Sequence, residues 1–248
     1  MDVHGSSSPR RFADRVAAML GRVEHRAAIS RVDREAAYRL RYEAYLRQNL
    51  LNERLDGILY DEVYDECPNS LTTLTYIDGE LASTVRVHIL NDEASSVSPA
   101  RDVFPDVLAP YLKAGRIIVD PSRLAARMDM AKRFPELPYL ALRAPWMAAR
   151  HFSVDYIALS CAVGHVGYYS KLYRFQIWSD LRNYPKVTAP VVCMGLDFAA
   201  EMERIEARYP SYRSTPSERE ALFRDFPVAP ASRGGRLPAA ADVQRADA

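Results

Sequence analysis

Apolar and polar residues alternate along several segments of the chain, and these segments predict the strands of a sheet. Leu71–Ile77 and Glu80–Leu90 are rich in β-branched residues and flank the dipeptide Asp78-Gly79. Two such segments around Asp-Gly are a strong signal for a β-hairpin. In the second segment apolar and polar residues alternate, so Arg86 is expected on the face opposite the valines.

Other segments follow the spacing of buried strands or amphipathic helices. The further predicted strands are Val23–Ile29, Ile117–Val119, Tyr156–Val163 and Pro190–Phe198. The predicted helices are Arg11–Leu20, Asp33–Asn49 with Asp33 as its N-cap, Leu137–Phe152 and Val166–Trp178. Residues 91–114 contain three prolines and are expected to hold short helical turns. Strands and helices alternate after an antiparallel start. This pattern favours an α/β (α+β) fold with one mixed sheet and helices on its faces.

The composition divides the chain into three parts. Residues 1–22 are expected to be an N-terminal extension that is partly helical, and residues 23–213 a single folded domain. From Ser214 onward the chain is rich in Ser, Pro, Ala, Gly and Arg, so residues 214–248 are expected to be a disordered tail.

The overall composition is that of a soluble globular protein. Hydrophobic residues make up 48% of the chain and charged residues 26%. No apolar run approaches the ~18 residues of a transmembrane helix, and residues 1–20 lack the apolar region of a signal peptide. The three cysteines, Cys67, Cys161 and Cys193, show no metal-binding spacing and argue against a disulfide framework. We therefore expect a cytoplasmic protein.

The net charge of +1 conceals two oppositely charged stretches. Residues 55–110 hold eleven acidic and two basic side chains, whereas residues 111–186 hold twelve basic and five acidic ones. A basic surface of this kind suits an acidic protein, a phosphate or a nucleic acid. Two solvated faces of opposite sign explain the charge equally well.

Polar side chains collect at the end of the strand Ile117–Val119. Asp120, Ser122 and Arg123 follow this strand directly. Pro121 has no N–H to donate, so strand pairing is expected to stop or bulge there. The sequence thus places an acid, a hydroxyl and a guanidinium at the end of a rigid element. A strand that simply ends in a Ser/Arg turn is the plainer interpretation.

Four short motifs resemble those of acyl-homoserine lactone synthases and occur in the same order. They are residues 40–45 (LRYEAY), 60–65 (YDEVYD), 84–86 (TVR, at the end of the hairpin) and 120–123 (DPSR). Residues 169–175 (YSKLYRF) resemble a helix of the broader Gcn5-related N-acetyltransferase (GNAT) fold. Aspartate at position 120 replaces the glutamate of the lactone synthases, and Leu50-Leu51 stands where they usually have tryptophan.

Over residues 23–200 the chain is most similar to the FeeM-like N-acyl amino acid synthases. The resemblance implies a GNAT-like fold with a mixed, mostly antiparallel sheet flanked by helices. It also implies transfer of a fatty acyl chain from acyl carrier protein to the amine of an amino acid or similar small amine. Two alternatives remain, a lactone synthase that uses S-adenosylmethionine and a non-catalytic GNAT-like module that binds an acyl chain or acyl carrier protein.

The glycine distribution bears on the acyl donor. Enzymes that use coenzyme A hold its pyrophosphate on a Gly-rich turn at a helix N-terminus. The chain has no glycine between Arg116 and Val163, so this turn is missing from its expected place. We expect no tightly bound cofactor and no nucleic-acid partner, with the acyl-phosphopantetheine delivered by acyl carrier protein. The basic stretch 111–186 suits that acidic partner.

The resemblance also implies roles for individual side chains. Asp120 and Ser122 belong to the strand-end motif, with Asp120 as the base that deprotonates the amine, and Tyr169 would protonate the leaving thiolate. The structural alternatives are an ion pair of Asp120 with Arg86 or Arg123, and a packed tyrosine at 169. Ser122 has no recognisable His/Asp partner, which argues against a serine triad.

A charge cluster is expected to shape the acceptor pocket. Its members, together with the neighbouring tyrosine, are Arg41, Tyr45, Asp61, Asp65, Arg86 and Arg123. The alternative is a salt-bridge network that orders residues 50–70. The histidines at 88, 151 and 165 lack metal-ligand spacing, so we expect no metal site.

Overall fold

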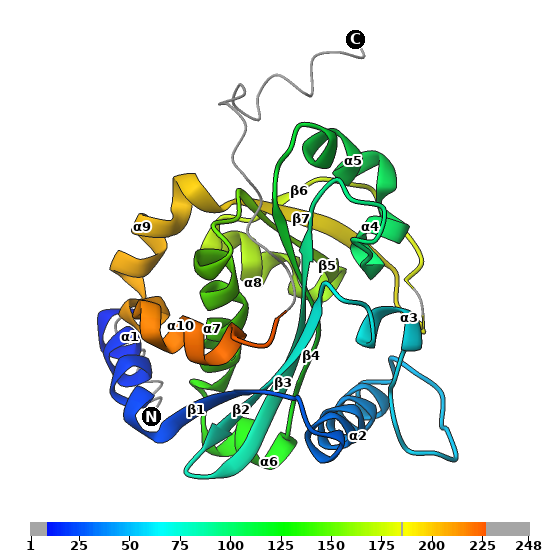
Figure 1. The fold of residues 1–248 in the computed structure, drawn as a ribbon. Coiled ribbons are helices and arrows are strands. Elements are labelled where there is room, and N and C mark those ends of the chain that lie inside the picture. The colour runs from blue at the N-terminus through cyan, green and yellow to red at the C-terminus, as the bar shows by residue number, and fades with distance from the viewer. Residues whose placement is uncertain (1–8, 185, 227–248) are drawn as a thin grey trace, which may run out of the picture.

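The computed structural model describes residues 9–184 and 186–226, which build a seven-stranded sheet with helices on both faces (Figure 1). The strands are β1 (Val23–Ala27), β2 (Ser70–Ile77), β3 (Glu80–Leu90), β4 (Ile118–Ala126), β5 (Tyr156–Ala162), β6 (Gln176–Ile177) and β7 (Val191–Asp197). Their order is β1-β2-β3-β4-β5-β7-β6, with β4 and β5 parallel and the other neighbours antiparallel. The expected single mixed sheet, mostly antiparallel and flanked by helices, is confirmed.

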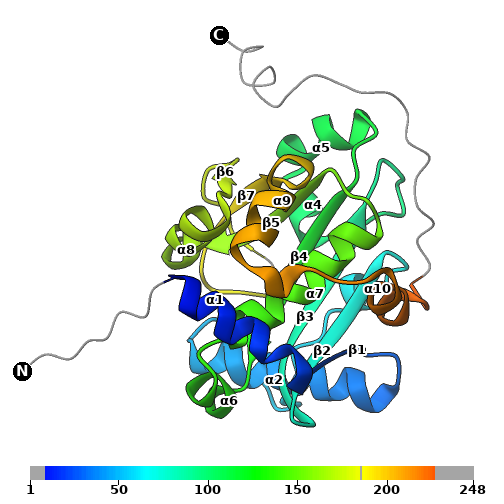
Figure 2. The same ribbon diagram turned by 90° about the vertical axis from the view of Figure 1, so that its left-hand side faces the viewer.

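Two groups of helices cover the sheet, as Figures 1 and 2 show. On one face lie α2 (Arg31–Arg47), α3 (Glu62–Asp65), α4 (Pro99–Val103) and α5 (Pro105–Lys113). On the other lie α1 (Pro9–Ala18), α7 (Leu137–His151), α8 (Val163–Tyr173), α9 (Phe198–Arg208) and α10 (Pro216–Phe223). The short α6 (Met128–Arg133) follows β4, and the 3-10 turns η1 (Leu20–Arg22) and η2 (Pro210–Tyr212) complete the elements.

The predicted hairpin is confirmed. Asp78 and Gly79 both have positive φ angles, 52° and 80°, as the tight turn of a two-residue hairpin requires. The valines of β3 are buried in the core that includes α7, whereas Arg86 lies on the opposite face. This face carries the polar residues of the candidate site.

The helix cap predicted at Asp33 is wrong. Ser30 caps α2, and its hydroxyl accepts a hydrogen bond from the N–H of Asp33 at 3.1 Å. The Asp33 carboxylate accepts a hydrogen bond from the Ser30 hydroxyl at 2.6 Å, which places Asp33 in the first turn. Ser and Asp are comparable caps, so composition alone did not separate them.

The disordered tail predicted from Ser214 is wrong for residues 214–226. Residues 216–223 form α10, which begins with a capping box between Thr215 and Glu218. Leu222 and Phe223 bury their side chains in the core beside α7. Residues 227–248 of the predicted tail lie outside the described residues. Within 9–184 and 186–226, no helix is both long and apolar enough to cross a membrane.

Candidate active site

The two central strands diverge at the end of a short parallel ladder. β4 pairs with β5 at Ile118–Tyr156 and Val119–Ile157, and the ladder then ends. β4 nevertheless continues along β3 to its last residue, and β5 continues along β7. The middle of the sheet therefore opens beyond Val119.

Pro121 explains where the ladder between β4 and β5 ends. The carbonyl of Ile117 accepts the N–H of Tyr156, so the backbone of Ile117 faces β5. Backbone groups alternate along a strand, so Val119 and Pro121 face β5 as well. Pro121 has no N–H and cannot extend this ladder. The expected stop at Pro121 is therefore correct for the β5 side.

On the β3 side the expectation for Pro121 is wrong. Pro121 pairs there with Val87, and the ladder passes through it to Ser122. The bulge follows Ser122, and Arg123 has a φ of 54°, a left-handed conformation that is uncommon outside glycine. The bulge turns the end of β4 toward the opening.

A cavity of about 550 Å³ fills the opening. Its volume lies within the range of small-molecule sites. The wall includes residues of α2 from one face of the sheet and residues of α7 and α8 from the other, so the cavity passes between the strands. Residues of the two diverging strands in the wall are Pro121, Ser122, Arg123, Leu124, Ala125, Ala126, Leu159, Ser160, Cys161 and Ala162.

The α2 side of the cavity carries a positive charge. The guanidinium of Arg123 lies 5.6 Å from the ring centroids of both Tyr45 and Tyr184, and all three residues line the cavity. Burial raises the pKa of Tyr184, so this ring is neutral near pH 7. Two aromatic rings thus flank a guanidinium that is only 4% exposed at the cavity wall.

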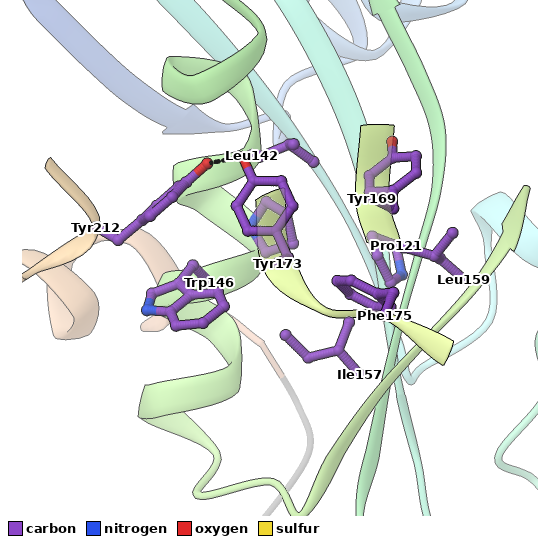
Figure 3. Close-up of a pocket in the computed structure, with 10 residues that line it drawn as sticks. Pro121, Leu142, Trp146, Ile157, Leu159, Tyr169, Tyr173, Phe175 and Tyr212 are labelled. Carbon is purple, nitrogen blue, oxygen red and sulfur yellow. Dashed lines mark hydrogen bonds between the residues drawn. The ribbon is translucent and has the colours of Figure 1, made fainter. Parts of the chain in front are cut away.

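The α7 side of the cavity is apolar. A second, smaller cavity of about 30 Å³ adjoins the first one, and the two share Pro121, Leu142, Leu159 and Tyr169 in their walls. Figure 3 shows aliphatic and aromatic side chains around this smaller cavity. Its remaining wall residues are Pro145, Trp146, Ile157, Tyr173, Phe175 and Tyr212.

The predicted charge cluster is split by the structure. Asp65 lies between the guanidinium groups of Arg41 and Arg86, at 2.8 Å and 3.0 Å, and all three side chains are buried. Arg86 also donates from Nε to the hydroxyl of Ser122 at 3.1 Å. Of these four residues, Ser122 lines the large cavity. Arg41, Asp65 and Arg86 therefore form a buried support behind the wall.

Asp61 and Asp120 also lie behind the cavity wall. Asp61 pairs with Lys186 at 3.1 Å. Asp120 is fully buried and accepts hydrogen bonds from the N–H of Ala100 at 3.2 Å and from Ser98. Burial raises the pKa of Asp120 to about 6, although these donors and Arg86 oppose the shift. The carboxylate is thus tied to the start of α4 and is more basic than usual.

Tyr169 lines both cavities. Burial raises its pKa far above the ordinary value of 10, so the phenol keeps its proton. A cysteine-like thiol has a pKa of ~8.5, and complete proton transfer from this phenol to a thiolate is therefore unfavourable. The geometry suits a hydrogen-bond donor better than a general acid.

Sequence reasoning missed several residues of the wall. Tyr184 stacks on Arg123, while Trp146 and Tyr212 close the apolar end. Each comes from a segment far along the chain, and an isolated aromatic residue gives no local signal of a binding site. Cys161 also lines the cavity, but burial raises its pKa to about 11, which disfavours a thiolate nucleophile.

The helices after β4 lack the usual features of a phosphate site. β4 leads directly into α6, and α7 begins at the acidic residue Glu136. The Glu136 carboxylate is mostly buried and pairs with Arg15 at 3.0 Å. Pro138 in the first turn of α7 removes one of the N–H groups that would face an anion.

Comparisons with known proteins agree with this architecture. FeeM, an N-acyl amino acid synthase from uncultured soil microbes, matches with a TM-score of 0.63 at 20% identity, over 75% of this chain and 97% of FeeM. The CoA-dependent acyl-homoserine lactone synthase BjaI, solved with SAM and isopentyl-CoA, gives 0.54 at 15% identity, over 76% of this chain and 89% of BjaI. The lactone synthase LasI gives 0.52 at 14% identity, over 73% and 94% of the two chains. At these identities the matches show a shared fold.

The sequence comparison defines the family. No curated protein matches the chain. The family of N-acyl amino acid synthase FeeM matches residues 36–197, which is more than half of the chain. The protein therefore belongs to the FeeM family of N-acyl amino acid synthases, a family of acyltransferases.

Proposed function

We propose that the protein transfers a fatty acyl chain from acyl carrier protein to the amine of an amino acid or similar small amine. The observation that carries this proposal is the cavity between β4 and β5. It has a cationic, aromatic side at Arg123 and an apolar side beneath α7. These two environments suit the carboxylate of an acceptor and the tail of an acyl chain, respectively.

The region after β4 supports a carrier protein as the donor. Coenzyme A brings a pyrophosphate that needs backbone N–H groups at a helix start. Here Pro138 removes one N–H donor from the start of α7, and Arg15, the basic side chain paired at that start, is already bound to the Glu136 carboxylate. A carrier protein delivers its phosphopantetheine arm without that group. All three cysteines are free thiols, which suits a cytoplasmic enzyme.

Arg123 is the best candidate to hold the acceptor. A planar guanidinium binds a carboxylate with two parallel hydrogen bonds, which lysine cannot reproduce. Among the three arginines considered from the sequence, Arg123 lines the cavity, whereas Arg41 and Arg86 contact Asp65. Ser122 and Tyr45 lie in the same wall and offer further hydroxyl groups.

The reaction is aminolysis of a thioester. The amine attacks the carbonyl carbon, the C–S bond breaks, and the amine proton must pass to a base. Asp120 would act through an intervening group, because its carboxylate lies behind the wall. The oxyanion needs backbone N–H donors. Pro121 has none and Ser122 pairs with Arg86 of β3, so Arg123 and Leu124 are the next candidates in the wall. Tyr169 would donate a hydrogen bond to the departing sulfur.

The decisive experiment combines the purified protein with one acyl chain on either acyl carrier protein or coenzyme A. The acceptors are a panel of amino acids, their amides, polyamines and S-adenosylmethionine, and mass spectrometry identifies the products. We expect N-acyl amino acids, formed more efficiently from the carrier protein. Equal efficiency with coenzyme A would exclude carrier dependence. Acyl-homoserine lactone would identify a lactone synthase, and acyl binding without any transfer would identify a non-catalytic module.

A further inference from the structure

The C-terminal segment Phe198–Phe226 lies beyond the family match, which ends at residue 197. It is fixed firmly to α7 by Arg143, a residue that is only 5% exposed. Arg143 donates to the backbone carbonyls of Ser211 and Arg213, at 2.7 Å and 3.0 Å, and contacts the carboxylate of Glu218 at 2.8 Å. These contacts hold η2 and α10 in one position against α7.

This segment supplies the end wall of the small apolar cavity. Tyr212 from η2 is fully buried and lies beside Trp146 of α7 and Tyr173 of α8 (Figure 3). The hydroxyl groups of Tyr173 and Tyr212 bond to each other at 2.5 Å. The indole N–H of Trp146 donates to Glu206 of α9 at 3.0 Å. The polar atoms of these three rings are therefore satisfied within the protein, and the wall offers a hydrocarbon surface.

We propose that Tyr212 ends the acyl-binding space and so sets the longest fatty acyl chain that the enzyme accepts. This inference rests on the proposed acyltransferase function. The small cavity of about 30 Å³ adjoins the large cavity and has room for about two water-sized groups, which suits the terminal carbons of a chain. A longer chain would have to displace a close-packed aromatic wall, and interiors of this kind do not yield easily.

Tyr212→Leu tests the proposal by removing the ring and keeping an apolar side chain. The enzyme receives an equimolar mixture of saturated acyl donors of increasing length, and mass spectrometry measures the ratio of products. We expect the wild-type profile to stop at a maximum length. In the variant, each further methylene that enters the new space should improve kcat/KM about fourfold.

Two control variants separate the wall from general destabilisation. Tyr209→Leu removes the same ring from the same segment at a buried position that does not line the cavity, so the maximum length should stay unchanged. Tyr212→Phe keeps the ring and removes the bond to Tyr173, and should also keep the wild-type maximum. If Tyr212→Leu does not fold, Tyr212→Met serves the same purpose, because its side chain has a similar volume but is unbranched and adapts better to an irregular space.

A binding measurement separates failure of this proposal from failure of the proposed function. Fatty acids of increasing length are titrated into wild type and Tyr212→Leu, and their dissociation constants are compared. The same shift of the length limit is expected in binding and in turnover. Active enzymes with identical length profiles would overturn the role of Tyr212 and leave the acyltransferase intact. Absence of any transfer with a shifted binding limit would overturn the acyltransferase and leave the wall intact.

Discussion

Arg41 and Asp65 form an ion pair of 2.8 Å whose side chains are 0% and 1% exposed. Arg86 reaches the same carboxylate oxygen from β3 at 3.0 Å. Burial alone would raise the pKa of Asp65, but the two guanidinium groups outweigh it and hold this pKa below its ordinary value. One carboxylate thus links α2, α3 and the central sheet immediately behind the cavity wall.

Asp65→Asn should therefore be strongly destabilising. The substitution leaves two buried guanidinium groups without their shared counter-charge, and the expected loss is about 3–5 kcal/mol in the free energy of unfolding, measured by urea denaturation. Glu35→Gln is the matched control, because Glu35 pairs with Arg39 on the exposed surface of α2. The control should leave the unfolding midpoint unchanged. Equal midpoints for the two variants would show that the buried pair does not support the fold.

Arg123→Lys should weaken acceptor binding selectively. The charge remains but the two-point contact with a carboxylate is lost, so the acceptor KM should rise about 10- to 100-fold while the donor KM stays constant. Arg41→Lys and Arg86→Lys should instead lower stability, because their guanidinium groups contact Asp65. Steady-state kinetics with each substrate varied in turn measures the difference. An unchanged acceptor KM in Arg123→Lys would remove this residue from the acceptor site.

The strands and the hairpin could be predicted because their signals are local. Side-chain alternation and the Asp78-Gly79 turn depend on neighbouring residues, and the structure confirms both. The helix α10 was not predicted, because its segment has the composition of a disordered tail even though it contains a capping box and two buried apolar residues. The expected end of strand pairing at Pro121 is right for β5 and wrong for β3. The sequence does not reveal which of the two neighbouring strands the missing N–H would face.

The candidate site was predictable only in part. The motif at 120–123 did lead to the opening between β4 and β5, with Ser122 and Arg123 in the cavity wall. The rest of this site includes Tyr184 and Tyr212, which lie about 60 and 90 residues after the 120–123 motif in the sequence. Their approach depends on tertiary packing, so no periodicity in the sequence marks them. For the same reason the sequence could not separate Arg123 from Arg41 and Arg86.

Lys132→Glu should slow the reaction with acyl carrier protein. Lys132 is exposed on α6, next to Ala131 in the cavity wall. Because exposed charges act mainly on encounter rates, kcat/KM should fall at low salt and approach the wild-type value as salt screens the charge. Lys113→Glu makes the same charge change on α5, at the opposite end of the sheet, and should have little effect (Figure 1). Equal losses of kcat/KM in both variants would argue against docking of the acyl carrier protein at α6.

Asp120→Asn should change the pH dependence of stability. In the folded protein the pKa of Asp120 is about 6, above its ordinary value of 3.8, because the group is buried. Between pH 4 and 6 the folded protein keeps a proton that the unfolded chain releases, so Asp120 makes the free energy of unfolding fall as the pH rises. The full decrease is about 3 kcal/mol, and it is complete above pH 6. Asp120→Asn cannot titrate, so its free energy of unfolding does not show this decrease. Urea denaturation should therefore show the stability of the variant rising relative to wild type, by up to about 3 kcal/mol, between pH 4 and pH 7.

If Asp120 is also the base, turnover of the folded variant should drop by about 10²–10⁴-fold. If the pH dependence of stability changes but turnover stays at the wild-type rate, Asp120 has no part in the reaction, and its role is the structural contact with α4.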